Sequence, residues 1–331
     1  MCDCQGNVPQ IPFCEREHKG LTTTDNNSWN SYDDEGQMML LFMIFAIVFF
    51  VLGGIVLIVL LVQRGKKLPA WILFVLFTIA WITLVILANI HAAQNPISMS
   101  YALNSLVTPL IRTPSVLDPN DVFPQHIQFQ EHFNDIKQEV LNFARDESKF
   151  PLFASSFGGM PGIASEYKDE KGETKTWRFF LVMAGNEFTQ PAKDLFPTLS
   201  KLVEENKDKV MLCAISLLPP KVKIVPHRGY SKAIVRYMLP IQVPPTDCFI
   251  CINGKQHTWT EGQSFAFDDN FVHSVYNNSN ETRINLFIDV LRDIPQYPIL
   301  SSFMQSMYKW GIQNSDAVKN EVKRTEYTVD A

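Results

Sequence analysis

Two apolar stretches near the N-terminus constrain this chain more than any other feature of its sequence. Residues 37–63 and 68–90 contain no Asp, Glu, Lys or Arg. A helix of about 20 apolar residues is long enough to cross a bilayer. Burial inside a soluble protein is the alternative, but two such stretches in tandem leave neither helix a polar face. The first stretch also begins too late and is too long for the apolar part of a signal peptide.

The sequence therefore predicts a transmembrane helical hairpin over residues 37–92, with helices at about 38–62 and 69–90. The loop between them contains three basic residues and no acid, whereas residues 1–36 hold seven acids and two bases. No Lys or Arg follows the second stretch until Arg112. Because basic loops remain in the cytosol, we expect the tail and the large C-terminal domain on the opposite side. The chain would be a multi-pass membrane protein with its domain in a secretory lumen, such as the endoplasmic reticulum, or outside the cell.

Cysteines and glycosylation motifs agree with this orientation without deciding it. Cys2, Cys4 and Cys14 crowd the acidic tail, as in disulfide-bonded extracellular segments. Cysteines in a cytosolic tail are instead candidates for palmitoylation. Sequons for N-glycosylation, which often arise by chance, begin at Asn26, Asn277 and Asn280.

After the hairpin the sequence divides into a linker, a domain and a tail. Residues 93–125 are rich in proline and form the expected juxtamembrane linker. The domain is expected over 126–300, and residues 301–331 are set apart as a C-terminal tail. The net charge of −5 and the lack of a basic stripe exclude nucleic acid as an expected partner.

Within the domain, helical patterns precede a series of short strands. Apolar residues recur at helical spacing over about 129–146, and a second helix is expected to begin near Pro197. A charged segment around Gly172 predicts a hairpin turn. From Val210 onwards, short segments rich in β-branched and aromatic residues are separated by Pro and Gly turns. The predicted fold class is a membrane-anchored, mainly β chain with flanking helices, whose domain is a cupin-like jelly roll, or double-stranded β-helix, around a ligand cavity.

Two histidines and two arginines follow one another along the predicted strands. His227 lies in "PHRG" at the expected start of a strand, His273 lies 46 residues later, Arg236 lies between them, and Arg283 lies ten residues after His273. Imidazoles suit Fe(II), and the planar fork of arginine suits carboxylates. A lone histidine is most often an ordinary surface or core residue, but this ordered set indicates a metal site beside a carboxylate site. Non-haem iron enzymes usually show His-x-Asp/Glu, whereas Gly229 stands here in place of the acid.

The segment from about Trp177 to Pro295 resembles the aspartyl/asparaginyl β-hydroxylase family of Fe(II)- and 2-oxoglutarate-dependent dioxygenases. The similar stretches include "WRFFLVMAGNEF", "CAISLLPPKVKIVPHRG", "WTEGQSFAFDDNFVHSVYN" and "RINLFIDVLRDIP", in family order. The animal enzyme of that family carries His-x-Gly and binds iron through two histidines. Bacterial relatives, including lipid A hydroxylases, carry His-x-Asp. The sequence "HRG" therefore resembles the two-histidine type.

The resemblance implies a role for each candidate residue. His227 and His273 would ligate Fe(II), with water completing the coordination shell. Arg283 would pair with the distal carboxylate of 2-oxoglutarate, and Ser216 would hydrogen-bond the same carboxylate. Arg236 would help to hold the keto-acid end, and O2 would be the second co-substrate.

Three other features qualify this assignment. Met238, a weak acceptor, stands where the animal enzyme has a histidine that contacts 2-oxoglutarate, which puts co-substrate affinity in doubt. Asp268 and Asp269 are interpreted as hydrogen-bonding residues of a turn, although one of them would suit the orientation of a metal ligand. Cys248 and Cys251 form a CxxC pair, but residues three apart on a strand point to opposite faces. No second pair follows, so zinc is not expected.

Three functions follow from these observations. The first is hydroxylation of Asp or Asn side chains of secretory-pathway proteins, favoured by His-x-Gly and the expected lumenal domain. The second is hydroxylation of a lipid or another membrane-associated substrate, suggested by the hairpin and by the lack of the helical repeats found in the animal enzyme. The third is a non-catalytic binding or scaffold protein that keeps the fold, suggested by Met238 and the missing acid. In each case the membrane is a partner.

Overall fold

The computed structural model describes residues 111–158 and 162–330, together with Cys14, Gly53, Gly54, Ile79, Asn104, Val107, Thr108 and Leu110. Apart from Gly53, Gly54 and Ile79, the predicted transmembrane hairpin lies outside these described residues. Within the described part of the chain, no helix combines the length and the apolar character needed to span a bilayer. The chain divides into two compact units, and the unit of residues 1–22 and 111–331 holds all five predicted site residues.

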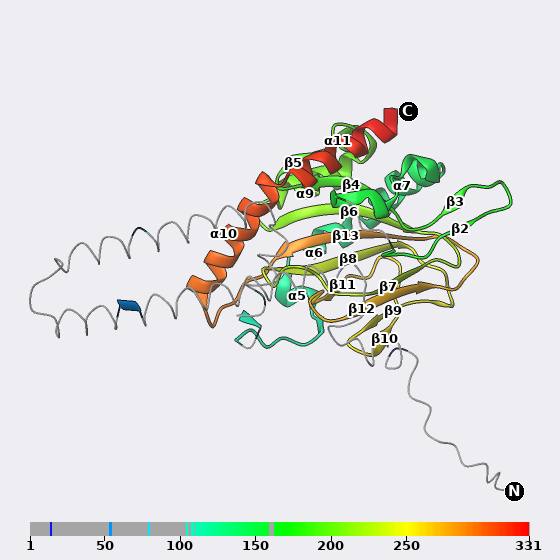
Figure 1. Ribbon diagram of the computed structural model, residues 1–331. Helices are drawn as coiled ribbons and strands as arrows, with labels where there is room; N and C mark the ends of the chain where they lie inside the picture. Colours follow the sequence, from blue (N-terminus) through cyan, green and yellow to red (C-terminus); the bar gives the residue numbers. More distant parts are fainter. Residues whose placement is uncertain are drawn as a thin grey trace, which may run out of the picture. The chain divides into compact units, whose positions relative to one another are not determined.

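Two antiparallel β-sheets form the centre of this unit (Figure 1). Among the described residues, the large sheet has seven strands in the order β1-β11-β8-β13-β6-β4-β5, and the small sheet has four in the order β10-β9-β12-β7. The two remaining strands, β2 and β3, pair with each other in a separate two-stranded sheet. The strands are β1 Val116–Leu117, β2 Tyr167–Lys168, β3 Thr174–Lys175, β4 Arg178–Ala184, β5 Glu187–Phe188, β6 Val210–Leu218, β7 Lys223–His227, β8 Ile234–Gln242, β9 Cys248–Ile252, β10 Lys255–His257, β11 Phe265–Phe267, β12 His273–Asn277 and β13 Arg283–Leu291.

From β6 onwards, most successive strands belong to different sheets. Strands β6, β8, β11 and β13 belong to the large sheet, whereas β7, β9, β10 and β12 belong to the small one. In the large sheet β13 pairs with both β6 and β8, and in the small sheet β12 pairs with both β7 and β9. This alternation confirms the predicted jelly roll. The segments expected as strands from Val210 onwards form β6 to β9 and β11 to β13.

Helices cover the outer face of the large sheet. Phe143 of α7 makes edge-to-face contacts with Phe180 of β4 and with Phe196, which directly precedes α9. The predicted helix over 129–146 is two helices, α6 and α7, separated at His132. The second predicted helix begins at Pro197 as expected, because proline is tolerated in the first turn. The helices are α5 Pro119–Val122, α6 His126–Glu131, α7 Phe133–Ala144, η1 Glu147–Lys149, η2 Phe153–Gly158, α8 Ala192–Leu195, α9 Pro197–Glu205, α10 Pro298–Asn314 and α11 Asp316–Asp330.

The segments that the sequence sets apart as linker and tail also contain regular elements. In the linker, β1 pairs with β11 of the large sheet. Beyond residue 300, α10 buries Met304, Tyr308 and Ile312, which recur every four residues on one side of the helix. That spacing buries one stripe of a helix against a neighbour.

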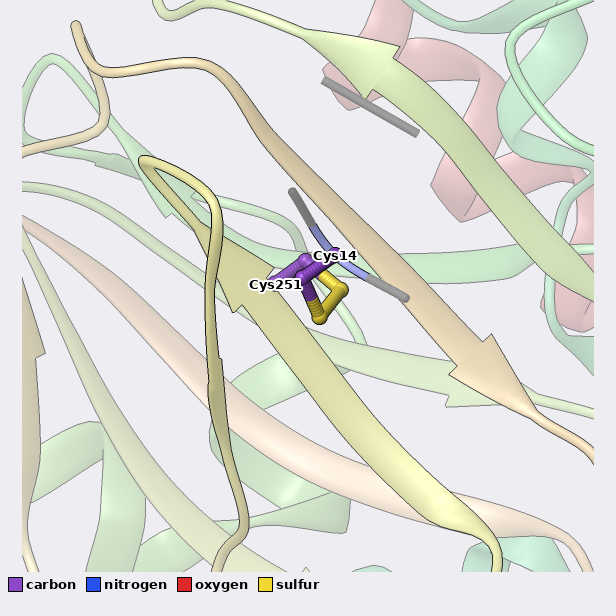
Figure 2. Close-up of a disulfide and its surroundings, with 2 residues drawn as sticks. All are labelled: Cys14 and Cys251. Atoms are coloured by element: carbon purple, nitrogen blue, oxygen red, sulfur yellow. A yellow bond between two sulfur atoms is a disulfide. The ribbon is translucent and has the colours of Figure 1, made fainter. Parts of the chain in front are cut away.

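A disulfide joins Cys14 of the acidic tail to Cys251 of β9 (Figure 2). The two residues lie 237 positions apart in the sequence, and their Cα atoms are 5.4 Å apart. Cys14 is buried with Tyr276 and packs near Phe249. For Cys14 the structure therefore supports the disulfide alternative. Cys248, the other cysteine of the CxxC pair, is buried and is not disulfide-bonded.

One predicted glycosylation motif is incompatible with the fold. The side chain of Asn277 is fully buried, and its Nδ2 donates to the backbone oxygens of Leu218, Pro219 and Glu281. Attachment of a glycan to this nitrogen would break all three hydrogen bonds and would require space that the core does not offer. Asn280, in contrast, is exposed in the turn that follows β12.

Candidate active site

The two histidines predicted as metal ligands lie side by side on the small sheet. His227 and His273 are directly opposed in the register of β7 and β12, and their ring centroids are 4.2 Å apart. The expectation that His227 begins a strand is wrong, because it is the last residue of β7. The loop with Gly229 follows it, so the strand ends where the backbone turns toward β8.

Backbone hydrogen bonds orient both imidazoles. Nδ1 of His227 lies 2.8 Å from the carbonyl oxygen of Val225, and Nδ1 of His273 lies 2.9 Å from that of Phe271. A carbonyl oxygen only accepts, so each Nδ1 carries a proton and each lone pair is on Nε2. Metal-binding histidines are commonly held in this way. The pair therefore fits a divalent transition metal.

The place of the missing acid is filled by Asp269 from the loop before β12. A Cβ atom on Gly229 would overlap the carboxylate group of Asp269. The backbone N–H of Gly229 also donates to the carbonyl oxygen of Asp269 at 2.6 Å. Glycine is thus a packing requirement at this position. The described residues contain no group of three or more His, Cys, Asp or Glu arranged to hold a metal ion, which leaves the two histidines as the candidate ligands.

Arg236 of β8 is engaged by two acids. Its Nε donates to Asp289 Oδ1 at 2.6 Å, and its Nη2 donates to Asp269 Oδ2 at 3.1 Å. Its guanidinium also lies 4.1 Å from the ring centroid of Phe287. Burial raises the pKa of Asp269 to about 7, against the opposing charge of Arg236, and burial also raises the pKa of Asp289. A keto acid that binds to Arg236 would have to compete with Asp269 and Asp289 for its guanidinium.

Asp268, next to Asp269, belongs to a separate buried cluster. Burial would raise the pKa of its carboxyl, but the charges of Arg292 and Lys232 outweigh this effect and lower the pKa below its usual value. Its Oδ1 also accepts from the backbone N–H of Asn270, as expected for a residue that shapes a turn. The prediction that Asp268 acts as a hydrogen-bonding residue of a turn is confirmed, whereas Asp269 contacts the loop after His227.

Arg283, at the start of β13, is buried without an acidic partner among the described residues. Its side chain is 1% exposed, its Nη1 lies 3.2 Å from Ser216 Oγ, and its Nε has no hydrogen-bond partner. Burial lowers the pKa of Arg283 to about 10, so the guanidinium is still charged at neutral pH. An unpaired buried charge is strongly unfavourable. The site is therefore built for an anion.

The surroundings of Arg283 contribute further unmet hydrogen-bonding groups. Asn285 is fully buried, lies opposite Ser216 in the sheet register, and has no partner for either amide atom. The ring of Trp259 lies 5.5 Å from the Arg283 guanidinium, and its indole N–H is also without a partner. Most of these groups are donors, which matches the acceptor oxygens of a carboxylate. The donor set thus fits 2-oxoglutarate on the Arg283 side of the site.

The structure therefore brings Ser216 and Arg283 together, as predicted, and places Arg236 in a separate group with its acids. Neither Asn285 nor Trp259 is among the predicted site residues. The signal for Asn285 was its position two residues after Arg283, which puts both side chains on one face of a strand. Met238 lies on β8 opposite Phe287 and Phe265, so apolar neighbours surround the position where the animal enzyme has histidine.

The described residues form a jelly-roll domain in which two adjacent histidines are candidate metal ligands and a buried arginine is a candidate carboxylate-binding group. The model of the aspartyl/asparaginyl β-hydroxylase family matches residues 130–293. This part of the chain belongs to that family. Helices α10 and α11 lie beyond the matched residues.

Individual relatives match over limited lengths. An ornithine lipid ester-linked acyl 2-hydroxylase from Rhizobium tropici is 25% identical over 174 residues, which is 52% of this chain and 59% of that protein. The aspartyl/asparaginyl β-hydroxylase of Homo sapiens is 31% identical over 75 residues, which is 23% of this chain and 10% of that protein. The chain thus spans less than two thirds of either relative.

Among solved structures, a prolyl hydroxylase from Trichoplax adhaerens, bound to a peptide of hypoxia inducible factor, is 11% identical. The match covers 52% of this chain and 82% of that chain with a TM-score of 0.31. A score of this size bears on neither fold nor function.

Proposed function

We propose that the protein is an Fe(II)- and 2-oxoglutarate-dependent hydroxylase. The observation that carries this proposal is the buried, unpaired guanidinium of Arg283 in a domain that also pairs His227 with His273. When bound, iron and 2-oxoglutarate would supply the oxidising power to insert one atom of O2 into a C–H bond.

The residues of the chain would bind and orient these groups. His227 and His273 would hold the metal through Nε2, since a backbone carbonyl fixes each Nδ1. Arg283 and Ser216 would hold the distal carboxylate of 2-oxoglutarate, and their burial would exclude competing water. Arg236 would bind the keto-acid end of 2-oxoglutarate while its guanidinium also remains hydrogen-bonded to Asp269 and Asp289.

The proposed substrate is an Asp or Asn side chain of a protein in the secretory pathway. Membership of the aspartyl/asparaginyl β-hydroxylase family supports this class. The disulfide between Cys14 and Cys251 supports the compartment, because such bonds persist in oxidising environments. It also joins segments from either side of the two apolar stretches, and two membrane crossings would return the chain to the same side.

A second candidate function is hydroxylation of a lipid or another membrane-associated substrate. Helix α10 exposes Ile299, Phe303 and Trp310, at 86%, 51% and 52%, on one side of the helix. The helix contains no Asp or Glu. An amphipathic helix with exposed Trp and Phe suits the membrane interface. The similarity to an ornithine lipid hydroxylase favours the same class.

Turnover by the purified full-length chain tests the proposal. We expect succinate release that requires Fe(II) and 2-oxoglutarate, coupled to a mass gain of one oxygen atom on the substrate. Peptides containing Asp or Asn and vesicles of defined lipids, supplied separately, distinguish the two substrate classes. His273→Ala is the matched control and should remove both signals. A chain that binds neither metal nor 2-oxoglutarate would instead be the binding or scaffold protein.

A further inference from the structure

Helix α10 lies outside the family-matched residues and delivers one tyrosine hydroxyl to the candidate site region. Tyr308 is 6% exposed and lies on the buried stripe of α10, between Met304 and Ile312. Its ring stacks on that of Tyr230 with a centroid distance of 6.0 Å and an interplanar angle of 18°. The hydroxyl oxygens of the two tyrosines are 2.8 Å apart. The helix is thus joined to the loop between β7 and β8.

Tyr308 also contacts the large sheet. Its hydroxyl donates to Asp289 Oδ2 at 3.4 Å. Either hydroxyl can donate the hydrogen bond between the two tyrosines. Burial raises the pKa of both tyrosines, and the nearby charge of Asp289 adds to this effect, so both hydroxyls keep their protons near neutral pH. Tyr230, Tyr308 and Asp289 therefore form a chain of hydrogen-bonded groups.

One end of this chain leads to the first candidate metal ligand. Tyr230 directly follows Gly229, which lies two residues after His227. The N–H of Gly229 is bonded to the carbonyl of Asp269, and Gly229 packs against the Asp269 carboxylate. The position of Tyr230 therefore affects the conformation of the loop after His227, where that loop packs against Asp269.

The other end leads to the arginine proposed for the keto acid. Asp289 accepts from Arg236, and Arg236 donates on to Asp269. The contacts thus form a closed ring, here called the Tyr308 network. Its members are Tyr308, Tyr230, Gly229, Asp269, Arg236 and Asp289.

We propose that Tyr308 is a positioning residue of the candidate active site. Through Tyr230 it fixes the loop that follows His227, and through Asp289 it fixes the guanidinium of Arg236. The inference rests on the proposed function, because the groups that it positions are the metal and co-substrate residues. It also gives α10 a role: the helix completes a site whose other residues come from the family-matched domain.

Substitution of the hydroxyl in the full-length chain tests this inference. Tyr308→Phe keeps the stacked ring and removes only the oxygen, and Tyr230→Phe removes the partner oxygen. Tyr297→Phe is the matched control, since Tyr297 precedes the same helix and is 43% exposed. Four measurements apply to each variant: thermal unfolding, Co(II) affinity with its visible absorption spectrum, 2-oxoglutarate affinity of the Co(II) form, and hydrogen exchange of the metal-free chain over residues 228–236.

We expect Tyr308→Phe to remain folded and to lose roughly 3- to 10-fold in 2-oxoglutarate affinity, as estimated from one net hydrogen bond. The Co(II) spectrum should change, and exchange over 228–236 should quicken. Tyr230→Phe should have the same effects at smaller size, because it removes the bond between the tyrosines and leaves the bond from Tyr308 to Asp289. The double variant should resemble Tyr308→Phe, which already lacks both bonds. Tyr297→Phe should match the wild type.

Two results have separate meanings. A wild-type chain that binds neither Co(II) nor 2-oxoglutarate overturns the proposed function, and with it this inference. A wild-type chain that binds both, together with a Tyr308→Phe variant of unchanged affinities, spectrum and exchange, overturns the positioning role alone.

Discussion

Arg236 and Arg283 lie on the same large sheet, yet their surroundings differ completely. Arg236 is 17% exposed along its side chain and is held by two carboxylates. Arg283 is 1% exposed, and no acid among the described residues pairs with it. A buried charge that already has its partners holds the fold together, whereas a buried charge without a partner indicates a ligand. The contrast makes Arg283 the candidate carboxylate-binding residue without reference to any relative.

The largest expected effect compares the two arginines in folding stability. Arg236→Met keeps the aliphatic stem but leaves Asp269 and Asp289 buried without their cation, which should destabilise the chain by about 3–5 kcal/mol. Arg283→Met removes a charge that no acid balances, so its loss should be far smaller. The measurement is chemical or thermal unfolding of the metal-free full-length chain. Equal losses in the two variants would contradict the comparison.

For ligand affinity we expect the opposite order, with a larger loss in the Arg283 variant than in the Arg236 variant. Arg283→Met should weaken 2-oxoglutarate binding about a hundredfold or more, because the buried carboxylate would lose its charged partner. Arg283→Lys keeps the charge without the planar fork and should rescue binding only in part. Calorimetry with Co(II) in place of iron gives the affinities, and Co(II) binding itself should persist. If Arg283→Met binds as tightly as wild type, Arg236 becomes the candidate anchor.

The acids around Arg236 should make the folding stability depend on pH, whereas the surroundings of Arg283 should not. Burial raises the pKa of Asp269 to about 7, above its value of about 4 in an unfolded chain. The folded state therefore binds this proton more tightly, and the resulting stability is complete below about pH 4 and is lost as the pH rises through about 7. Asp269→Asn should flatten the fall in melting temperature between pH 5 and pH 8. An equally steep fall in that variant would refute the assignment.

The strands could be predicted from the sequence because each one depends on the pattern of a few neighbouring residues. Strand β6, from Val210 to Leu218, is apolar except for Ser216, and such runs form buried strands in many contexts. The roles of His227, Ser216 and Arg283 came from the resemblance to a family. The structure places Ser216 beside Arg283 and His227 beside His273, which is the proximity that these roles require.

Other features depend on contacts between residues that are far apart in the sequence, and local patterns do not indicate them. The disulfide of Cys14 joins residues 237 positions apart, and no spacing rule indicates such a partner. The overlap between Gly229 and Asp269 depends on the approach of two loops. Tyr308 was missed because its stripe on α10 recurs only three times, within a segment that the sequence sets apart as a tail.

The smallest expected effect concerns Ser216, which supports the Arg283 side of the comparison. Its hydroxyl oxygen is 3.2 Å from Arg283 Nη1 and also accepts from the indole N–H of Trp177 at 2.9 Å. Both bonds are donated to Ser216, so its own proton is available for a ligand carboxylate. Ser216→Ala should therefore cost about 1.5–3 kcal/mol in 2-oxoglutarate affinity, the range for one hydrogen bond to a charged group.

That loss should be smaller than the loss in Arg283→Met, and Co(II) affinity should again persist. Ser216→Thr is the matched control, because it keeps the hydroxyl and should retain most of the affinity if the site accepts one methyl group. Calorimetry on the three chains separates the contributions. If Ser216→Ala binds 2-oxoglutarate as tightly as wild type while Arg283→Met does not, the hydroxyl only orients the guanidinium, and the carboxylate is held by Arg283 with Asn285 or Trp259.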